Sequence, residues 1–191
     1  ATQFGMNLEG PALENGSFLF SARRSYLDFI FRAAGFGFVP EYWDFMGKWK
    51  YSPGPSDEIK VVAVMALDNI NFYNDTQEQI YDNSLILGND QRQVSGGVSW
   101  RRLVEQGVFT VTFGQAYTEF SYFQRDTLQN PLFVNESIEN ESSLRGDVLI
   151  EIAHRTTLTA GVMGKRVRFS NDLFLPDFVT PYGDTLKADV R

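Results

Sequence analysis

The chain has 191 residues, of which 43% are hydrophobic and 15% aromatic, and this content excludes a chain that stays disordered. Its formal net charge of −7 argues against a nucleic-acid partner, because nothing in the sequence resembles a basic patch. No cysteine is present, which excludes disulfides, thiol catalysis and cysteine-bound metals. The length suggests one domain, or part of a larger one.

The sequence contains no candidate for a membrane-crossing helix. Such a helix needs about 20 mostly apolar residues, and the best apolar run, residues 61–67, is much shorter. Strands that cross a membrane need only about 9–11 residues each, and only half of them are apolar. A membrane protein built from strands therefore remains compatible with the overall hydropathy.

In chain order, the first informative segment is residues 17–31, SFLFSARRSYLDFIF, which places two arginines inside an apolar and aromatic run. Read as a helix, Leu19, Ala22 and Tyr26 share a face at spacings of three and four. Read as a strand, Phe18, Phe20 and Ala22 point one way. Ser17, Ser21, Arg23 and Ser25 then point the other way. The periodicity of this segment leaves both structures open.

The segments that follow alternate apolar and other residues with a period of two, which favours strands over helices. They cover residues 42–51, 58–72, 94–104, 108–120, 144–154 and 157–169. Residues 58–73 and 107–125 can each be read as one long strand, which exceeds the usual strand of about 5–6 residues.

The connections between these segments alternate between short and long. Short ones with turn chemistry lie at residues 9–17, 52–57, 105–107 and 154–157. Long ones are predicted at residues 32–41, 74–93, 124–140 and 171–185. This alternation is typical of outer-membrane barrels, whose periplasmic turns are short and whose extracellular loops are long.

The sequence therefore predicts an all-β fold, in which residues 1–191 form part of one antiparallel transmembrane β-barrel of about seven to nine strands. Two alternatives remain open. One is a complete small barrel of eight strands in the outer membrane that acts as an adhesin or anchor. The other is a soluble β-sandwich whose aromatic-rich loops bind carbohydrate.

In a barrel, the two faces of each strand would meet different surroundings. Aromatic side chains near both strand ends would form girdles at the membrane interfaces. The side chains expected to face lipid include Trp43, Phe45, Trp49, Tyr51, Phe109 and Phe113. Those expected to face the lumen or to contact a plug are Arg23, Asp44, Lys48, Lys50, Arg145, Asp147 and Glu151.

Arg24 conflicts with the strand reading, because it would share the lipid face with Phe18 and Ala22. A lipid-facing arginine costs about 2–4 kcal/mol at the bilayer midplane and almost nothing at the interface. Arg24 is therefore expected either near the outer rim, with its head group reaching water, or turned inward by a β-bulge.

Several segments resemble the barrel of TonB-dependent outer-membrane receptors, especially the Bacteroidetes-like branch. The most specific is GSFLFSARRSYLDFIF, residues 16–31, with its Ser-x-Arg-Arg-x-Tyr-Leu-Asp pattern. The further segments that look like the hairpins of this family are residues 42–72, 96–120 and 135–166.

The resemblance implies active uptake of a scarce solute: a siderophore, cobalamin or an oligosaccharide. Members of the family close about 22 strands around a plug domain. No plug is visible in the sequence, so the chain is expected to be a middle slice of the barrel. The partners implied are outer-membrane lipid, the remainder of the barrel, the plug, a TonB-type energy-transducing complex of the inner membrane that acts through the plug, and the solute ligand.

No constellation in the sequence predicts an enzyme or a cofactor. The only histidine, His154, has no second histidine or cysteine with which to bind a metal or build a catalytic group. Asp75, Asp82 and Asp90 lie in one predicted loop and are weak calcium candidates, but their spacing matches no defined calcium loop. We therefore expect no metal.

Overall fold

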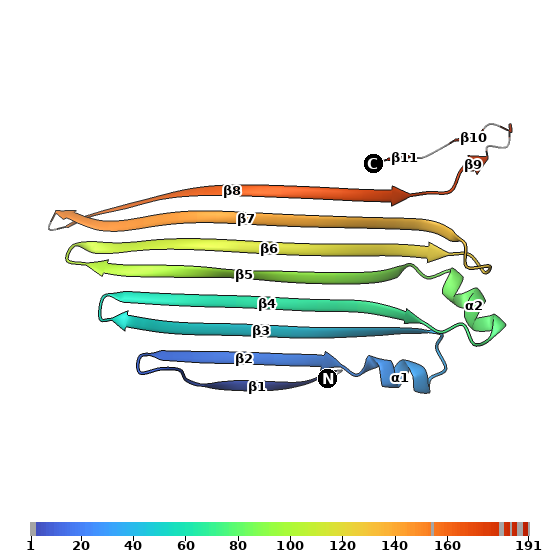
Figure 1. The fold of residues 1–191 in the computed structure, drawn as a ribbon, viewed down its shortest axis with the longest axis horizontal. Helices are drawn as coiled ribbons and strands as arrows, with labels where there is room; N and C mark the ends of the chain where they lie inside the picture. The colour runs from blue at the N-terminus through green and yellow to red at the C-terminus, as the bar shows by residue number, and fades with distance from the viewer. Residues whose placement is uncertain (1–2, 154, 180–181, 184, 187–188, 191) are drawn as a thin grey trace.

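The structure is a computed structural model that describes residues 3–153, 155–179, 182–183, 185–186 and 189–190. It is an all-β fold with eight long strands in one antiparallel sheet and two short helices (Figure 1). The long strands are β1 (Gln3–Pro11), β2 (Gly16–Ser25), β3 (Phe38–Gly54), β4 (Asp57–Phe72), β5 (Gly88–Val104), β6 (Gly107–Arg125), β7 (Pro131–Ala153) and β8 (Thr156–Phe174). The helices are α1 (Leu27–Ala33) and α2 (Gln77–Ser84), and the two-residue strands are β9 (Phe178–Val179), β10 (Thr185–Leu186) and β11 (Asp189–Val190).

Each long strand pairs with the next one along the chain, so the sheet is a simple meander from β1 to β8. The short strand β11 adds to the free side of β8, and β9 pairs with β10 separately. In Figure 1, β1 and β8 lie on opposite sides of the sheet. The predicted antiparallel all-β fold is confirmed, and β6 has the predicted limits of 107 and 125.

The ambiguous segment at residues 17–31 contains both predicted structures in succession. Strand β2 ends at Ser25, and helix α1 begins at Leu27. The backbone N–H of Leu27 donates to the hydroxyl of Ser25 at 3.1 Å, which supports the change of direction. The strand pattern was therefore correct for the first half of the segment and the helical pattern for the second.

The connections are short at one end of the sheet and mostly longer at the other. Among the described residues, the tight turns span 12–15, 55–56 and 105–106. At the opposite end, α1 and α2 lie within the first two longer connections. The expected long loop at residues 124–140 is wrong, because β6 continues to Arg125, β7 starts at Pro131 and only residues 126–130 connect them.

Two other loops are shorter than predicted. Strand β3 already begins at Phe38 and β5 at Gly88, inside the loops expected at 32–41 and 74–93. Strand β8 runs to Phe174, and part of the expected loop after it lies outside the described residues.

The sheet forms a single layer with almost no core of its own. Val39 is the only buried hydrophobic residue in the described part of the chain, at 1% exposure. A folded domain of this size normally buries roughly 70% of the surface of its unfolded chain. Both faces of the sheet are therefore open in the described residues.

Neither helix in the described part of the chain is long and apolar enough to cross a membrane.

Candidate functional site

The strand register sorts the side chains into two faces, because directly opposed residues on neighbouring antiparallel strands point the same way. Trp49 lies opposite Val61, and Val61 lies opposite Val98. Val98 in turn lies opposite Phe113, so Trp49 and Phe113 share a face across four strands. All six predicted aromatic residues lie on this face, which we call the apolar face: Trp43, Phe45, Trp49, Tyr51, Phe109 and Phe113.

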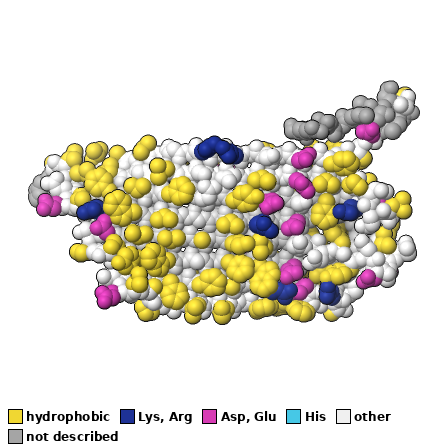
Figure 2. Space-filling model, viewed as in Figure 1, with side chains coloured by type: hydrophobic (Ala, Val, Ile, Leu, Met, Phe, Trp, Pro, Cys, Tyr) yellow, Lys and Arg dark blue, Asp and Glu magenta, His cyan; other side chains and the backbone are white. Residues whose placement is uncertain are grey.

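The apolar face carries a continuous belt of hydrophobic side chains nearest the tight turns, which we call the apolar band (Figure 2). The band residues on β3 and β4 are half-buried, whereas others are exposed, with values of 48% for Phe113, 57% for Leu144 and 75% for Val162. On strands β3 to β8 it consists chiefly of Trp43, Phe45, Trp49, Tyr51, Ile59, Val61, Met65, Leu67, Val94, Val98, Trp100, Phe109, Val111, Phe113, Tyr117, Leu144, Val148, Ile150, Leu158, Ala160 and Val162.

Stacked aromatic pairs lie near both ends of the band on β3. The ring centroids of Trp43 and Phe45 are 5.9 Å apart, and those of Trp49 and Tyr51 are 5.6 Å apart. Trp43 lies toward the helices and Tyr51 toward the tight turns. The two ends of β3 thus have the aromatic placement that the girdle prediction requires.

The limit of the band toward the helices crosses the sheet obliquely. Toward the helices, the first polar residue of the apolar face is Glu41 on β3, Asn69 on β4 and Arg92 on β5, and then Gln115 on β6, Ser142 on β7 and Arg166 on β8. The register places Arg166 level with Gly47, six residues nearer the turns than Glu41 (41 to 47), through the successive partners Ala63, Gly96, Gln115 and Ser142.

This offset corresponds to a defined angle. Six residues span about 20 Å, and five strand spacings from β3 to β8 span about 24 Å, which gives an angle of about 40°. Figure 1 shows the same stagger at the other end, where the tight turns reach successively further from β1–β2 to β3–β4 and β5–β6. The band therefore crosses the strands at an angle like the strand tilt of membrane barrels.

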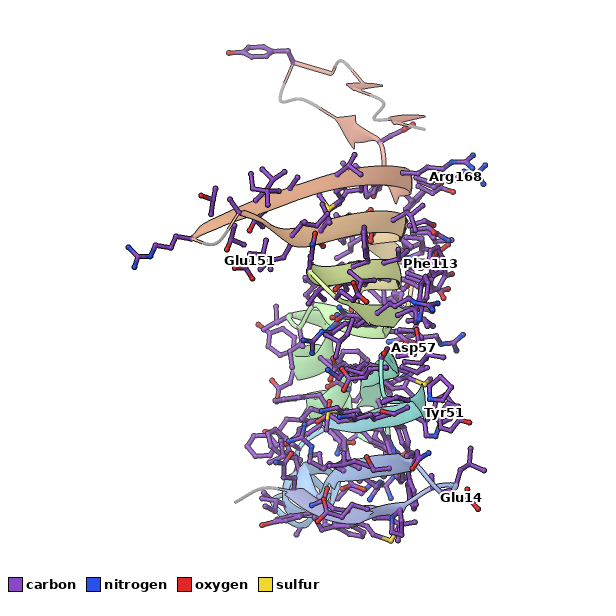
Figure 3. The ribbon with its side chains drawn as sticks, turned by 90° about the vertical axis from the view of Figure 1, so that its left-hand side faces the viewer. Glu14, Tyr51, Asp57, Phe113, Glu151 and Arg168 are labelled. Carbon is purple, nitrogen blue, oxygen red and sulfur yellow. The ribbon has the colours of Figure 1, made fainter. Side chains whose placement is uncertain are left out.

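The opposite face, which we call the polar face, carries all seven residues predicted to face a lumen or plug: Arg23, Asp44, Lys48, Lys50, Arg145, Asp147 and Glu151. Figure 3 shows Glu151 on the side of the sheet opposite to Tyr51 and Phe113.

Several of these residues take part in ion pairs on the polar face. Arg23 and Asp44, on neighbouring strands, are 3.4 Å apart, and Arg145 and Asp147 are 2.7 Å apart. Glu58 is shared by Lys50 at 2.7 Å and Lys60 at 2.6 Å, and Lys165 lies 2.8 Å from Glu141. Such exposed pairs stabilise a fold by no more than about 1 kcal/mol each. Their main effect is a surface of mixed charge.

Arg24 lies on the apolar face at the helix end of β2, opposite Trp43 and without a bulge between β2 and β3. Its guanidinium is 3.0 Å from Glu41 and 2.9 Å from Asp28, and it stacks on Trp43 at 5.2 Å. The side chain is only 18% exposed. The structure thus has no bulge at Arg24 and pairs the arginine with two carboxylates at the helix end of the strand.

The three calcium candidates are not brought together. Asp75 precedes α2, Asp82 lies within it, and Asp90 lies in β5. In the described part of the chain, no group of three or more acidic or histidine residues could hold a metal ion. His154 lies outside the described residues.

Sequence reasoning missed one concave feature, a pocket beside α2 whose wall includes Phe123 and Arg125. It forms only because the connection between β4 and β5 folds over the end of β6. The one signal in the sequence was the crowding of aromatic residues at the end of β6.

Comparison with known proteins found no matching protein family, no matching curated protein and no matching solved structure.

Proposed function

We propose that this chain forms part of the wall of an outer-membrane β-barrel, with the apolar band against lipid and the polar face toward the lumen. The observation that carries the proposal is the oblique band. The band spans nine residues on β3, β4 and β6 (43–51, 59–67 and 109–117), and seven, seven and five on β5, β7 and β8. Nine residues tilted by about 40° span a height of about 23 Å, close to the roughly 25 Å of the apolar belt in outer-membrane barrels. A sheet that faced water on both sides would have no reason for such a belt.

Within this class, we propose active uptake of a scarce solute by a TonB-dependent receptor. The resemblance of residues 16–31 and of the later hairpins to that family supports this assignment. The mixed charges of the polar face suit contact with a plug domain, and a TonB-type complex of the inner membrane would act through that plug. The connections at the helix end would capture the solute outside the cell.

A second candidate is a complete eight-stranded outer-membrane barrel that serves as an adhesin or anchor. The number of long strands in the sheet, eight, favours it, because eight strands can close around an interior filled with side chains. It requires β1 to pair with β8. The sandwich alternative gains no support, since the eight long strands lie in one sheet and not in two packed layers.

Tryptophan fluorescence tests the lipid contact directly. The chain has three tryptophans, and all three, Trp43, Trp49 and Trp100, lie in the apolar band. The protein extracted from its source membrane would be reconstituted in vesicles whose acyl chains carry bromine near the head group or near the methyl end. We expect quenching by both lipids and stronger quenching by the shallow bromine, because these residues lie toward the band edges.

Emission that responds to dissolved acrylamide and not to brominated lipid would refute the proposal. The intact mass of the native protein separates the two membrane candidates. A mass several times 21.7 kDa would support a receptor of which this chain is one part, whereas a mass near 21.7 kDa in the membrane fraction would support the small closed barrel.

A further inference from the structure

A pocket of about 230 Å³ opens at the helix end of the sheet, between α2, the end of β6 and the turn at residues 126–130. In Figure 1, α2 lies at the helix end of the sheet, next to the start of β5. The pocket is lined by Phe72, Asn74, Asn83, Ser84, Ile86, Phe123, Arg125 and Gln129. It therefore combines aromatic rings, amides and one cation.

Hydrogen bonds between distant segments hold the walls of this pocket. The side-chain amide of Asn83, a residue only 7% exposed, donates to the carbonyl oxygens of Gly37 at 3.2 Å and Tyr73 at 2.9 Å. The side-chain amide of Gln124 donates to the carbonyl of Ser84 at 2.8 Å and so ties β6 to the end of α2. The pocket is thus built by the fold before any ligand arrives.

The aromatic wall is fixed by close packing. The ring of Phe123 lies against Gly88 so tightly that a Cβ at residue 88 would come within 2.6 Å of it. The ring of Phe72 meets Phe123 edge-on, with centroids 5.8 Å apart and planes inclined by 72°. This arrangement gives a fixed apolar surface against which a flat or puckered ring can pack.

The cation of the pocket is available for a ligand. The guanidinium of Arg125 lies 5.9 Å from the centre of the Phe123 ring, and no carboxylate of the described residues forms an ion pair with it. The neighbouring carboxylate of Asp126 accepts hydrogen bonds from the backbone N–H groups of Leu128 and Asn130, both at 2.8 Å. A planar guanidinium binds a carboxylate through two parallel hydrogen bonds.

We propose that this pocket binds a single ring that bears a carboxylate, with the carboxylate on Arg125 and the ring against Phe72 and Phe123. The volume is below the range of about 300–1,000 Å³ usual for larger ligands, which limits the occupant to one ring. Gln129 supplies an amide for ring substituents, and Asn74 supplies its amide N–H groups, because its side-chain oxygen already accepts from Asn83 at 2.8 Å. An aromatic acid and a sugar acid share this chemistry. The role of the pocket as the capture site for an imported solute rests on the proposed function.

The test is calorimetric titration of the detergent-extracted protein with benzoate and glucuronate, each beside its uncharged counterpart, benzamide and glucose. We expect at least one acid to bind more tightly than its counterpart. Arg125→Gln should weaken that binding at least about tenfold, because a charge-assisted hydrogen bond is lost. Arg125→Lys, which keeps the charge without the planar fork, should give an intermediate loss. Arg101→Gln, on an exposed arginine near the tight turns, is the matched control and should change nothing.

Benzoate binding alone would assign the pocket to aromatic acids, and glucuronate binding alone to sugar acids. Binding of neither acid at millimolar concentration, equal binding of the uncharged probes, or equal losses in the Arg125→Gln and Arg101→Gln proteins would overturn the inference. Failure of the proposed function is recognised separately. It would appear as absence of the protein from the outer-membrane fraction, whether or not the acids bind.

Discussion

Neighbouring residues on one strand meet different surroundings in this sheet. Val61 lies in the apolar band, opposite Trp49 and Val98, whereas Val62 lies on the polar face, opposite Lys48. Both are valines in the middle of β4, so neither local sequence nor strand propensity distinguishes them. Only the face on which each residue lies differs, which makes the pair a direct test of the proposed lipid contact.

We expect Val61→Arg to destabilise the protein in detergent or lipid by about 2 kcal/mol, because it places a charge on the lipid face between the midplane and the interface. Val62→Arg should change the free energy of unfolding by no more than about 0.5 kcal/mol, since that face is already polar. Urea unfolding in lipid vesicles measures both. Equal effects at the two positions would contradict the assignment of the faces.

At the scale of elements, β6 and β7 continue beyond the apolar band and end in a tight connection organised by Asp126. Its carboxylate accepts hydrogen bonds from the backbone N–H groups of Leu128 and Asn130, and the side-chain amide of Asn130 also donates to it at 3.0 Å. These bonds support the left-handed backbone of Gln129, with φ of 67°. The carboxylate of Asp126 thus organises a short connection at residues 126–130, where the sequence predicts a long loop.

The hydrogen bonds from the side chain and backbone of Asn130 lower the pKa of Asp126 from its ordinary value. The turn is therefore stabilised at every pH above about 3.9, and the stabilisation is lost only as the pH falls through the lowered pKa. We expect the amide proton shifts of Leu128 and Asn130 to titrate in NMR spectra with a midpoint below about 3.9.

The Asp126→Asn protein is the control for this titration, since it removes the group and should leave both amide shifts insensitive to acid in this range. A midpoint at or above the ordinary value in the unmodified protein would show that the turn does not depend on the charged carboxylate.

At the scale of the whole molecule, the sheet is one layer with an apolar belt on one side and mixed charge on the other. Such a layer has almost no core within the described residues, and its stability depends on what covers each face. The oblique limit of the belt means that the strands cannot stand upright in a membrane if the belt is to match the bilayer. The angle between this limit and the strands then sets the tilt of the strands from the membrane normal.

Polarised infrared spectroscopy of the protein in oriented bilayers measures this tilt. We expect the strands to lie at about 40° to the bilayer normal, the angle at which the limit of the apolar band becomes parallel to the membrane plane. Strands that lie flat on the bilayer surface would refute insertion. Strands close to the bilayer normal would refute the oblique course of the band from β3 to β8.

The sequence by itself determined the strands and the separation of their faces. Alternation with period two is a local property, so Trp49 and Lys50 are assigned to opposite faces before any partner strand is known. The signal weakens where both faces are polar, which is why residues 131–140 were predicted as loop although they lie in β7. Neither the lipid nor the lumen assignment of these faces follows from alternation alone.

Only the tertiary structure decided the features that depend on register and on contacts between distant segments. The position of Arg24 beside Glu41, the oblique course of the apolar band and the pocket at Phe123 and Arg125 all require knowledge of which residues lie opposite one another. The physical reason is that register is a relation between strands. A shift of one residue would turn every side chain of a strand to the other face without changing the sequence pattern.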